Sequence, residues 1–503
     1  MPIQSVNPAN GDVLRSFTAL TDEAVQEKIS LAETAFARYA EVPLSHRELC
    51  MRKLAQLLED DAAELATLAT TEMGKPIVAA RAEVLKCANA CRYYAGHAAR
   101  ILAPEHIDIG DHDAYVRWDP IGIVLAIMPW NFPFWQVFRF LAPALMAGNV
   151  GLLKHASNVP QCALAIEALV RRAGFPRGTF QTLLIDSSQV EHVLADERVA
   201  AVTVTGSEAT GRAIAAQAGW FIKKSVLELG GSDPFIVMPS ANLDATVAAA
   251  VRARTINNGQ SCIAAKRFIV ADSIYDAFER QFVAGMDALK IGDPMLDTTD
   301  IGPLATARQV GELHAQVQAA VVAGGRLLTG GEPMVGKGNY YEPTVIAGVP
   351  RTAAVAREEI FGPVALLFRV RDIDEAIAVA NDTPFGLAAS AWTSNPTEQR
   401  RFTAELRCGA VFVNEVVASD PRLPFGGIKH SGYGRELSAA GMREFLNAKT
   451  VVIAEAVATQ LPVPEKISSE ADQSAERAPI PFRDVMRDAM ARESAPIKTR
   501  AVK

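Results

Sequence analysis

Long apolar runs, cationic blocks and a leader-like start are all missing from this sequence of 503 residues. No apolar stretch reaches the roughly 18 residues that a membrane-spanning helix requires, and Ile121–Met128 fits a single buried strand. The formal net charge is −7, and no lysine- or arginine-rich block stands out. The N-terminus lacks the charged start and apolar core of a signal peptide. We therefore expect a cytoplasmic protein with neither a membrane nor a nucleic-acid partner.

Cysteine is scarce, with six residues scattered along the chain and no paired framework. This usage is typical of a reducing compartment. Cys87 and Cys91 stand four residues apart on one helix face, a spacing that can suggest a metal ligand pair. No histidine pair or second cysteine pair accompanies them, so we expect no metal site.

The chain is long enough for two or three domains with ample cores. Its first hundred residues carry apolar side chains at helical spacing, which predicts helices at Glu23–Tyr39, Ser45–Leu68 and Val78–Ala98. From residue 122 short β-rich runs alternate with helical ones, and a second alternating stretch covers 234–412. This alternation predicts two α/β domains with mainly parallel sheets and a site between them.

The expected elements of the first alternating stretch are strands 122–127, 150–154, 182–184, 199–203 and 225–229, with helices 135–147, 159–173 and 210–218. Two further runs, His112–Trp118 and Lys449–Glu455, read as short strands outside these domains. From residue 460 the chain becomes rich in Pro, Ser, Glu and Lys and reads as a disordered tail. Within it, 482–491 has one apolar helical face, so a short docking helix is the alternative.

Two short motifs carry the strongest chemical signal. Leu227–Gly231 places Glu228 at the end of an expected strand, and Gly259–Cys262 places a cysteine among small polar residues. A cysteine and a carboxylate suit covalent catalysis, in which the thiolate attacks a carbonyl and the carboxylate later activates water. Taken singly, Cys262 can also be an inert buried thiol and Glu228 an ordinary strand end.

Two more motifs accompany them in a fixed order. Pro129–Pro133 contains Asn131, whose amide can donate to an oxyanion, and Glu358–Pro363 adds a carboxylate and an aromatic ring. Together the four motifs resemble the aldehyde dehydrogenase superfamily, from about residue 7 to residue 450. Within it the resemblance is greatest to the succinate semialdehyde dehydrogenases, especially the short bacterial type with Lys154-His155 at the cofactor strand.

The resemblance implies the α/β aldehyde dehydrogenase fold, with two Rossmann-like domains and a small β oligomerisation arm. The implied divisions are a cofactor-binding domain at 1–101 and 121–230, a catalytic domain at 231–445, an arm at 102–120 and 446–460, and the tail at 461–503. A homodimer or homotetramer is expected. Relatives of the short bacterial type generally end near residues 450–453, so the tail is a departure.

The catalytic roles implied by the resemblance fall on three residues. Cys262 would attack the aldehyde, and Asn131 together with the Cys262 N–H would stabilise the oxyanion. Hydride transfer to a nicotinamide leaves a thioester, and Glu228 would be the general base for its hydrolysis. Relatives that pass the acyl group to coenzyme A generally lack this glutamate, so water is the expected acceptor.

The cofactor evidence does not include the usual Gly-x-Gly-x-x-Gly fingerprint, which is absent. A Thr-Gly-Ser turn at 205–207 opens a helix that can meet a pyrophosphate. Lys154 matches the family lysine that reaches the adenosine ribose, and Ser157 stands where strictly NAD-dependent relatives tend to carry glutamate. Because serine does not repel a 2′-phosphate, NADP is favoured, with NAD as a possible second cofactor. The implied cofactor residues are Ile127, Met128, Pro129, Trp130, Lys154, Ser157, Gly206, Ser207, Thr210, Gly211, Glu228, Leu229, Glu359 and Phe361.

The expected substrate class depends on Arg139, eight residues after Asn131 and among aromatic side chains. A guanidinium there can clamp a substrate carboxylate, and succinate semialdehyde enzymes place arginine at this point. An arginine that the family often carries six residues before the cysteine is Ile256 here, and Arg254 falls on a different helix face. The implied substrate residues are Arg139, Ser261, Ser419, Phe132 and Phe425.

Several alternatives stay open from the residues alone. Arg139 can be a surface salt bridge, and the substrate can be another short ω-carboxylated aldehyde such as glutarate semialdehyde. A catalytically retired structural protein on the same fold is opposed by the presence of Cys262, Glu228 and Asn131.

Overall fold

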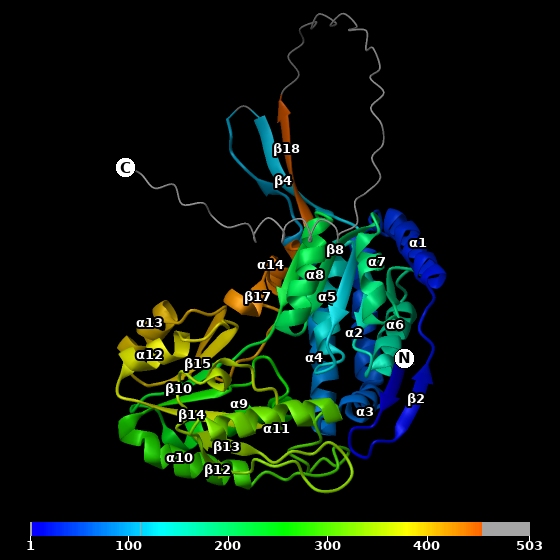
Figure 1. Ribbon diagram of the computed structural model, residues 1–503. Coiled ribbons are helices and arrows are strands. Elements are labelled where there is room, and N and C mark those ends of the chain that lie inside the picture. Colours follow the sequence, from blue (N-terminus) through cyan, green and yellow to red (C-terminus); the bar gives the residue numbers. More distant parts are fainter. Residues whose placement is uncertain (1–2, 111, 455–503) are drawn as a thin grey trace, which may run out of the picture. The chain divides into compact units, whose positions relative to one another are not determined.

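Two open sheets, each enclosed by helices, make up most of the chain (Figure 1). The computed structural model describes residues 3–110 and 112–454. A third, three-stranded sheet and an N-terminal hairpin of β1 (Ile3–Val6) and β2 (Val13–Phe17) complete the strands of this part of the chain. The mixed, mainly parallel α/β architecture agrees with the fold class expected from the sequence.

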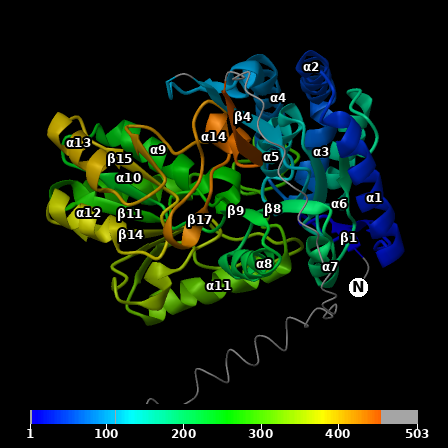
Figure 2. The same cartoon turned by 90° about the horizontal axis from the view of Figure 1, so that it is seen from above.

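The first sheet has the strand order β17-β9-β8-β5-β6-β7. All pairs are parallel except that of β17 with β9. Its strands are β5 (Ile123–Met128), β6 (Val150–His155), β7 (Phe180–Thr182), β8 (Val199–Thr205), β9 (Lys224–Glu228) and β17 (Gly432–Tyr433). Every residue of β5 is buried, as expected for a central parallel strand covered on both faces. In Figure 2 the sheet lies between α5 (Trp135–Ala147) and α8 (Glu208–Trp220).

The second sheet has the order β12-β13-β14-β11-β10-β15-β16, with only the β12–β13 pair antiparallel. Successive residues of its strands enter different cores. Phe235 and Val237 pack in one cluster, while Ile236 packs in another on the opposite face. This alternation shows both faces covered. The strands are β10 (Pro234–Val237), β11 (Arg267–Ala271), β12 (Arg326–Thr329), β13 (Thr344–Ala347), β14 (Val364–Val370), β15 (Ala388–Trp392) and β16 (Ala410–Val413).

The N-terminal helices cover the first sheet in two ways: the first packs directly on β5, β6 and β7, and the other three pack against helices that cover the sheet. They are α1 (Asp22–Tyr39), α2 (Leu44–Asp60), α3 (Ala62–Met73) and α4 (Ile77–Ile101), and α4 packs along α2 and α5. The single helix predicted at Ser45–Leu68 is wrong. The chain leaves helical geometry at Asp61 (φ −95°, ψ 10°), so that α2 and α3 are separate helices. The apolar periodicity continues across this break, so the sequence pattern does not reveal where the first helix ends.

The remaining helices surround the two sheets. They are α6 (Pro160–Arg172), α7 (Val190–Ala195), α9 (Leu243–Thr255), α10 (Asp272–Asp287), α11 (Ala307–Val322), α12 (Ile373–Asn381), α13 (Pro396–Glu405) and α14 (Ser438–Arg443). Among residues 3–110 and 112–454, no helix is both long and apolar enough to cross a membrane. The strand predicted at 182–184 lies two residues earlier, at β7, because pairing with β6 starts at Phe180.

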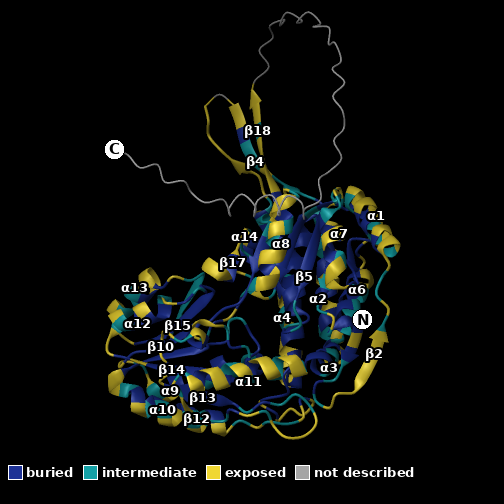
Figure 3. Ribbon diagram, viewed as in Figure 1, coloured by how far each residue is buried: buried dark blue, intermediate teal, exposed yellow. Residues whose placement is uncertain are grey.

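A three-stranded sheet joins two segments far apart in the sequence. It has the order β18-β4-β3, with β3 (Glu105–His106), β4 (His112–Pro120) and β18 (Leu446–Ala454). Most residues of β4 and β18 are only partly covered or exposed, as Figure 3 shows in yellow and teal. The predicted tail at 461–503, with its possible helix at 482–491, lies outside the described residues.

The β17–β9 pair couples the C-terminal segment to the strand that ends at Glu228. Gly432 has φ +111°, and a Cβ there would lie 2.0 Å from the Leu227 carbonyl oxygen.

Gly432→Ala should therefore lower the free energy of unfolding by about 2 kcal/mol or more, since both backbone strain and overlap are introduced. Chemical denaturation measures this. Gly219→Ala is the control, because its Cβ would meet nothing within 4 Å in α8 and should leave stability unchanged or raise it by up to about 1 kcal/mol. Equal midpoints for the two variants would contradict the prediction.

Candidate active site

The carboxyl ends of parallel strands bring the first site residues together. β9 ends at Glu228, which pairs in register with Thr205 at the end of β8, and the Gly206 N–H donates to the Glu228 carbonyl at 3.0 Å. β5, next to β8, runs directly into the Pro129–Pro133 segment. Ligands of open α/β sheets bind at this edge, and the sequence motifs fall there.

Cys262 follows a turn of unusual geometry. Asn257, Asn258 and Gly259 all have left-handed backbone angles, with φ of 57°, 58° and 74°. A Cβ on Gly259 would lie 2.3 Å from the Gly362 carbonyl, so only glycine fits this close approach. The two asparagines tolerate this region better than other non-glycine residues. The turn thereby directs Cys262 toward the end of β9.

Buried amides hold this turn in place. Asn258 Nδ2 donates to the Gly74 and Pro303 carbonyls at 3.0 Å each, and its Oδ1 accepts from the Gly302 N–H at 2.9 Å. Asn257 Nδ2 donates to the Asn131 carbonyl at 2.7 Å. The turn is therefore tied both to the end of α3 and to the loop that carries Asn131.

Asn131 is buried beside the cysteine loop. Its Nδ2 donates to the Gln260 carbonyl at 3.1 Å, and its Oδ1 accepts from the Phe132 N–H at 3.1 Å. Gln136 Nε2 lies 3.4 Å from the same Oδ1. Since the amide nitrogen has two hydrogens, this arrangement leaves one to donate to an oxyanion.

A buried ion pair positions the start of α5. Glu83 Oε1 accepts from the N–H groups of Phe134 and Trp135 at 2.8 and 2.9 Å. Its other oxygen is paired with Lys75, whose ammonium also lies 4.1 Å from the centre of the Phe132 ring. The carboxylate thus satisfies free amides at the helix start, where negative charge is also favoured by the helix dipole.

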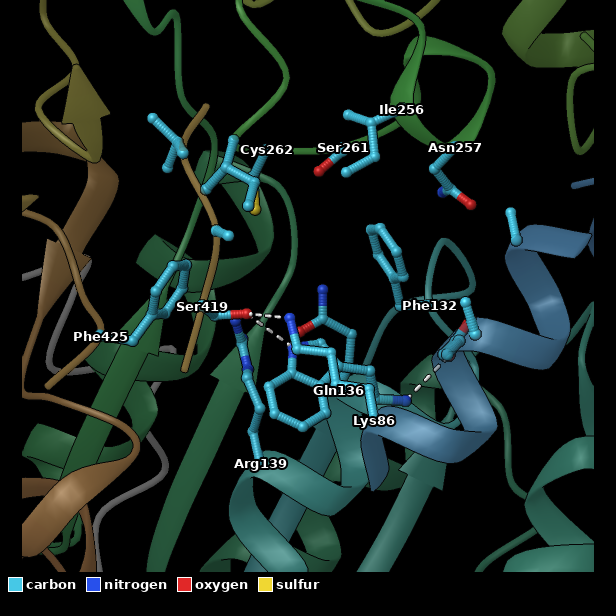
Figure 4. Close-up of a pocket in the computed structure, with 17 residues that line it drawn as sticks. Lys86, Phe132, Gln136, Arg139, Ile256, Asn257, Ser261, Cys262, Ser419 and Phe425 are labelled. Carbon is cyan, nitrogen blue, oxygen red and sulfur yellow. Dashed lines mark hydrogen bonds between the residues drawn. The ribbon is translucent and has the colours of Figure 1, made fainter. Parts of the chain in front are cut away.

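Two cavities meet at Cys262. The first cavity has a volume of about 230 Å³ and the second about 270 Å³. Both are lined by Cys262 and Gln136. The first cavity is lined by Ala79, Ala82, Glu83, Lys86, Phe132, Trp135, Gln136, Arg139, Ile256, Asn257, Ser261, Cys262, Ile263, Val417, Ala418, Ser419 and Phe425, and is drawn in Figure 4. The thiol therefore lies where two ligands entering from different sides would touch.

The second cavity collects most of the expected cofactor residues. Trp130 and Phe361 form one wall, with their rings edge to face at 5.7 Å. Of the expected set, Pro129, Trp130, Gly206, Ser207, Glu228, Leu229, Glu359 and Phe361 line it. Glu359 is held there by the Gly231 N–H at 3.0 Å and lies 3.7 Å from the Lys266 ammonium.

The other expected cofactor residues lie outside this lining. Ile127 and Met128 are buried in β5, Lys154 is near the end of β6, and Ser157 is exposed in the turn that follows. Thr210 and Gly211 belong to the first turn of α8, which Ser207 caps through its hydroxyl. A Cβ on Gly211 would lie 2.5 Å from Leu229, so this glycine permits close packing of α8 on the segment after β9. These six assignments, like those of the residues that line the second cavity, remain predictions.

Burial dominates the electrostatics of the two reactive groups. It raises the pKa of Cys262 to about 12, although Arg139 and Lys266 oppose the shift. Burial, with the nearby Glu436 carboxyl, also raises the pKa of Glu228 well above its usual range, opposed by Arg139 and Arg435. The resting thiol is therefore protonated at neutral pH. A carboxyl with a raised pKa is suited to exchanging protons near neutrality.

Arg139 is in an ion pair, but a buried one. Its Nε lies 2.6 Å from Glu436 Oε2, its Nη2 donates to Thr205 Oγ1 at 3.3 Å, and its guanidinium lies over Phe425. It nevertheless lines the first cavity with Phe132, Ser261, Ser419 and Phe425, which gathers the five expected substrate residues. The alternative of a surface salt bridge is wrong, because both partners are buried.

The arginine that relatives often carry six residues before the cysteine is replaced by Ile256 in this chain. Ile256 lines the first cavity, whereas Arg254 does not and donates to the Gly259 carbonyl at 2.7 Å, supporting the cysteine turn.

Sequence reasoning missed Lys86, Gln136 and Glu436. Lys86 and Gln136 line the first cavity, and Glu436 pairs with Arg139 from the C-terminal segment. Lys86 stands among small residues of a long amphipathic helix, a pattern that reads equally well as a solvated face. Gln136 was identifiable from its position within the helix that carries Arg139. No sequence signal links Glu436 to a site almost three hundred residues away.

Comparison with known proteins gives a consistent result. The sequence model of the aldehyde dehydrogenase family matches residues 1–451. Succinate-semialdehyde dehydrogenase [NADP(+)] 1 of Mycobacterium tuberculosis strain H37Rv is 54% identical over 457 residues, covering 90% of this chain and 100% of that protein. A probable succinate-semialdehyde dehydrogenase [NADP(+)] of Synechocystis is 53% identical over 454 residues, with 90% and 100% coverage.

Solved structures agree on the fold. Succinic semialdehyde dehydrogenase from Streptococcus pyogenes, determined with NADP+ as the cofactor, superposes with a TM-score of 0.88 at 37% identity, covering 90% of this chain and 100% of that one. With the four motifs converging on Cys262 and the family model spanning nearly the whole described chain, the protein belongs to the aldehyde dehydrogenase family.

Proposed function

We propose that the protein oxidises succinate semialdehyde to succinate with NADP+ and water. The observation that carries the proposal is the first cavity, where cationic side chains stand beside a cysteine in an otherwise largely apolar wall. A buried carboxylate needs charged or hydrogen-bonding partners, and Arg139, Ser261 and Ser419 offer them here. Relatives more than half identical bear the names of NADP-dependent succinate semialdehyde enzymes, which supports the same substrate and cofactor.

The second cavity fits a nicotinamide dinucleotide. The start of α8 presents free N–H groups suited to a pyrophosphate, and the rings of Trp130 and Phe361, set edge to face, offer an aromatic wall. When bound, the cofactor accepts a hydride from the aldehyde carbon. Lys154 and Ser157 would hold its adenosine end, and Glu359 with Phe361 its nicotinamide end.

The chain's own residues divide the remaining chemistry. Cys262, once deprotonated, adds to the aldehyde carbonyl, while the free Asn131 amide hydrogen and the Cys262 N–H stabilise the oxyanion. Losing one such donor typically costs about 10²–10³ in rate. After oxidation a thioester remains on Cys262. Glu228, at the end of β9 and beside the thiol in the second cavity, takes a proton from the water that hydrolyses it.

We also propose how the rest of the chain serves this reaction. Segments 1–101 and 121–230 would form the cofactor-binding domain and 231–445 the catalytic domain, which lends β17 to the first sheet. The β3–β4–β18 sheet would be the arm of a homodimer or homotetramer. All six cysteines are free thiols, which supports a location in the reducing cytoplasm.

The substrate proposal is tested by an aldehyde panel. With NADP+, kcat/KM for succinate semialdehyde should exceed that for butanal by about 10²-fold or more, because only the former offers a carboxylate to the cavity. Glutarate semialdehyde should fall between them, since one methylene is worth about 1–3 kcal/mol. A panel in which butanal equals succinate semialdehyde would remove the substrate assignment and leave the family membership intact.

The role of Glu228 is tested by Glu228→Gln. The variant should produce about one equivalent of NADPH per site in a rapid burst and then stall, because acylation does not require the base but hydrolysis does. Stopped-flow absorbance records both phases, and Cys262→Ala should show neither. Steady turnover of Glu228→Gln at the wild-type rate would show that another group activates the water.

Cofactor choice is tested at the exposed turn after β6. Ser157→Glu should raise KM for NADP+ by about tenfold or more while changing KM for NAD+ little, because a carboxylate would face the 2′-phosphate. Ser157→Gln introduces a side chain of the same size as glutamate but without its charge. It should therefore raise KM for NADP+ much less. If both variants raise KM for NADP+ and for NAD+ equally, Ser157 does not adjoin the ribose.

A further inference from the structure

Lys86 extends from α4 into the wall of the first cavity. Its Nζ donates to Ser419 Oγ at 2.8 Å and lies 4.4 Å from the centre of the Trp135 ring. Figure 4 shows Lys86 reaching Ser419 beside Arg139, with Cys262 in the same cavity. The ammonium thus lies among the residues proposed to bind the substrate.

The charge on Lys86 has no carboxylate partner within ion-pair distance in the described part of the chain. The two neighbouring cations differ in this respect. Lys75 is paired with Glu83, and Arg139 is paired with Glu436 at 2.6 Å. The cationic lining of the first cavity therefore has one member without a carboxylate partner, a half-buried ammonium that the carboxylate of a ligand would pair with.

The hydrogen bonds of Ser419 point to an anion as that ligand. Its hydroxyl oxygen accepts from Lys86 Nζ at 2.8 Å and from Trp135 Nε1 at 3.1 Å. Because both lone pairs are taken by these donors, the hydroxyl hydrogen is left to donate. Two further hydrogens remain on the Lys86 ammonium, and Arg139 Nη1 has no protein acceptor among the described residues. These three donors suit a carboxylate.

We propose that Lys86 is a specificity-determining residue that, with Ser419, binds the distal carboxylate of the substrate aldehyde. The inference rests on the proposed function and refines it. Arg139, whose charge is already balanced by Glu436, would contribute a hydrogen bond from the other side rather than the main charge. The remaining wall contains Ala79, Ala82 and Phe132, which would contact the methylene carbons of the substrate.

The charge state of Lys86 gives the proposal a pH signature. Burial, together with the positive Arg139, lowers the pKa of Lys86 to about 8, while Glu83 and Cys87 on its own helix and Asp420 on the facing loop act in the opposite direction. The ammonium is therefore mostly charged at pH 7 and loses its proton as the pH rises through 8. The substrate carboxylate stays ionised throughout this range. Preference for a carboxylated aldehyde should consequently fall above pH 8.

Substitution of Lys86 tests the charge directly. Lys86→Met keeps the length of the side chain and removes the ammonium. In the wild-type holoenzyme background it should lower kcat/KM for succinate semialdehyde by about 10²-fold, mostly through KM, and change kcat/KM for butanal less than threefold. Lys86→Arg keeps the charge and should recover most of the loss. Lys53→Met removes an exposed lysine from α2 and should leave both aldehydes unaffected.

The outcomes separate this inference from the proposed function. If wild-type enzyme prefers succinate semialdehyde and Lys86→Met keeps that preference, the Lys86 assignment is wrong and the function stands. Parallel losses on both aldehydes also overturn the assignment, because they indicate damage to the cavity. If wild type does not distinguish the aldehydes, both proposals fail.

The pH dependence of the wild-type enzyme's substrate preference provides a second test. The ratio of kcat/KM for succinate semialdehyde to that for butanal cancels the ionisation of Cys262 and Glu228, which both substrates share. This ratio should be constant below pH 7 and fall by about tenfold between pH 7.5 and pH 9.5, since kcat/KM reports the free enzyme. In Lys86→Arg the fall should disappear, because guanidinium stays charged. A flat wild-type ratio would overturn the inference.

Discussion

Everything in this active site depends on the left-handed turn at Asn257–Gly259 and on the buried amide that holds it. Three successive residues in that backbone region are unfavourable, and the conformation persists only where surrounding contacts determine it. The Asn258 side chain supplies those contacts, by joining Gly74 after α3 with Gly302 and Pro303. One side chain therefore connects the cysteine loop to the N-terminal helices, and the strain lies three to five residues before the nucleophile.

The same helices position the other partners of the thiol. Glu83 on α4 caps α5 through the amides of Phe134 and Trp135, and it is itself neutralised by Lys75. α5 then presents Gln136 and Arg139 to the cavities. Because Lys86 lies one turn beyond Glu83 on α4, one helix both orients the oxyanion loop and supplies the cation proposed for substrate recognition. Substrate selection and catalytic geometry thus share a rigid support.

Sequence alone predicted the fold class, the two alternating α/β stretches and the motifs around Cys262, Glu228 and Asn131, because each is local and chemically distinctive. It missed the break at Asp61, where apolar periodicity continues while the helix does not. It also missed the roles of Lys86 and Glu436. An isolated lysine on a helix and an isolated glutamate in a loop become informative only when the chain brings them to Ser419 and Arg139.

Charge balance explains why these two residues matter together. Glu436 lies near Glu228 and raises the pKa of that carboxyl, while Arg139 counters the effect on Glu228 and pairs with Glu436. If Arg139 were the main receptor of the substrate carboxylate, binding would draw its charge away from both glutamates and alter the base. A separate cation at Lys86 allows the substrate to be held by its distal end while the Arg139–Glu436 pair remains intact. Recognition of charge and control of the general base are then carried by different side chains, and a change at Lys86 should affect selectivity while leaving hydrolysis of the thioester unaffected.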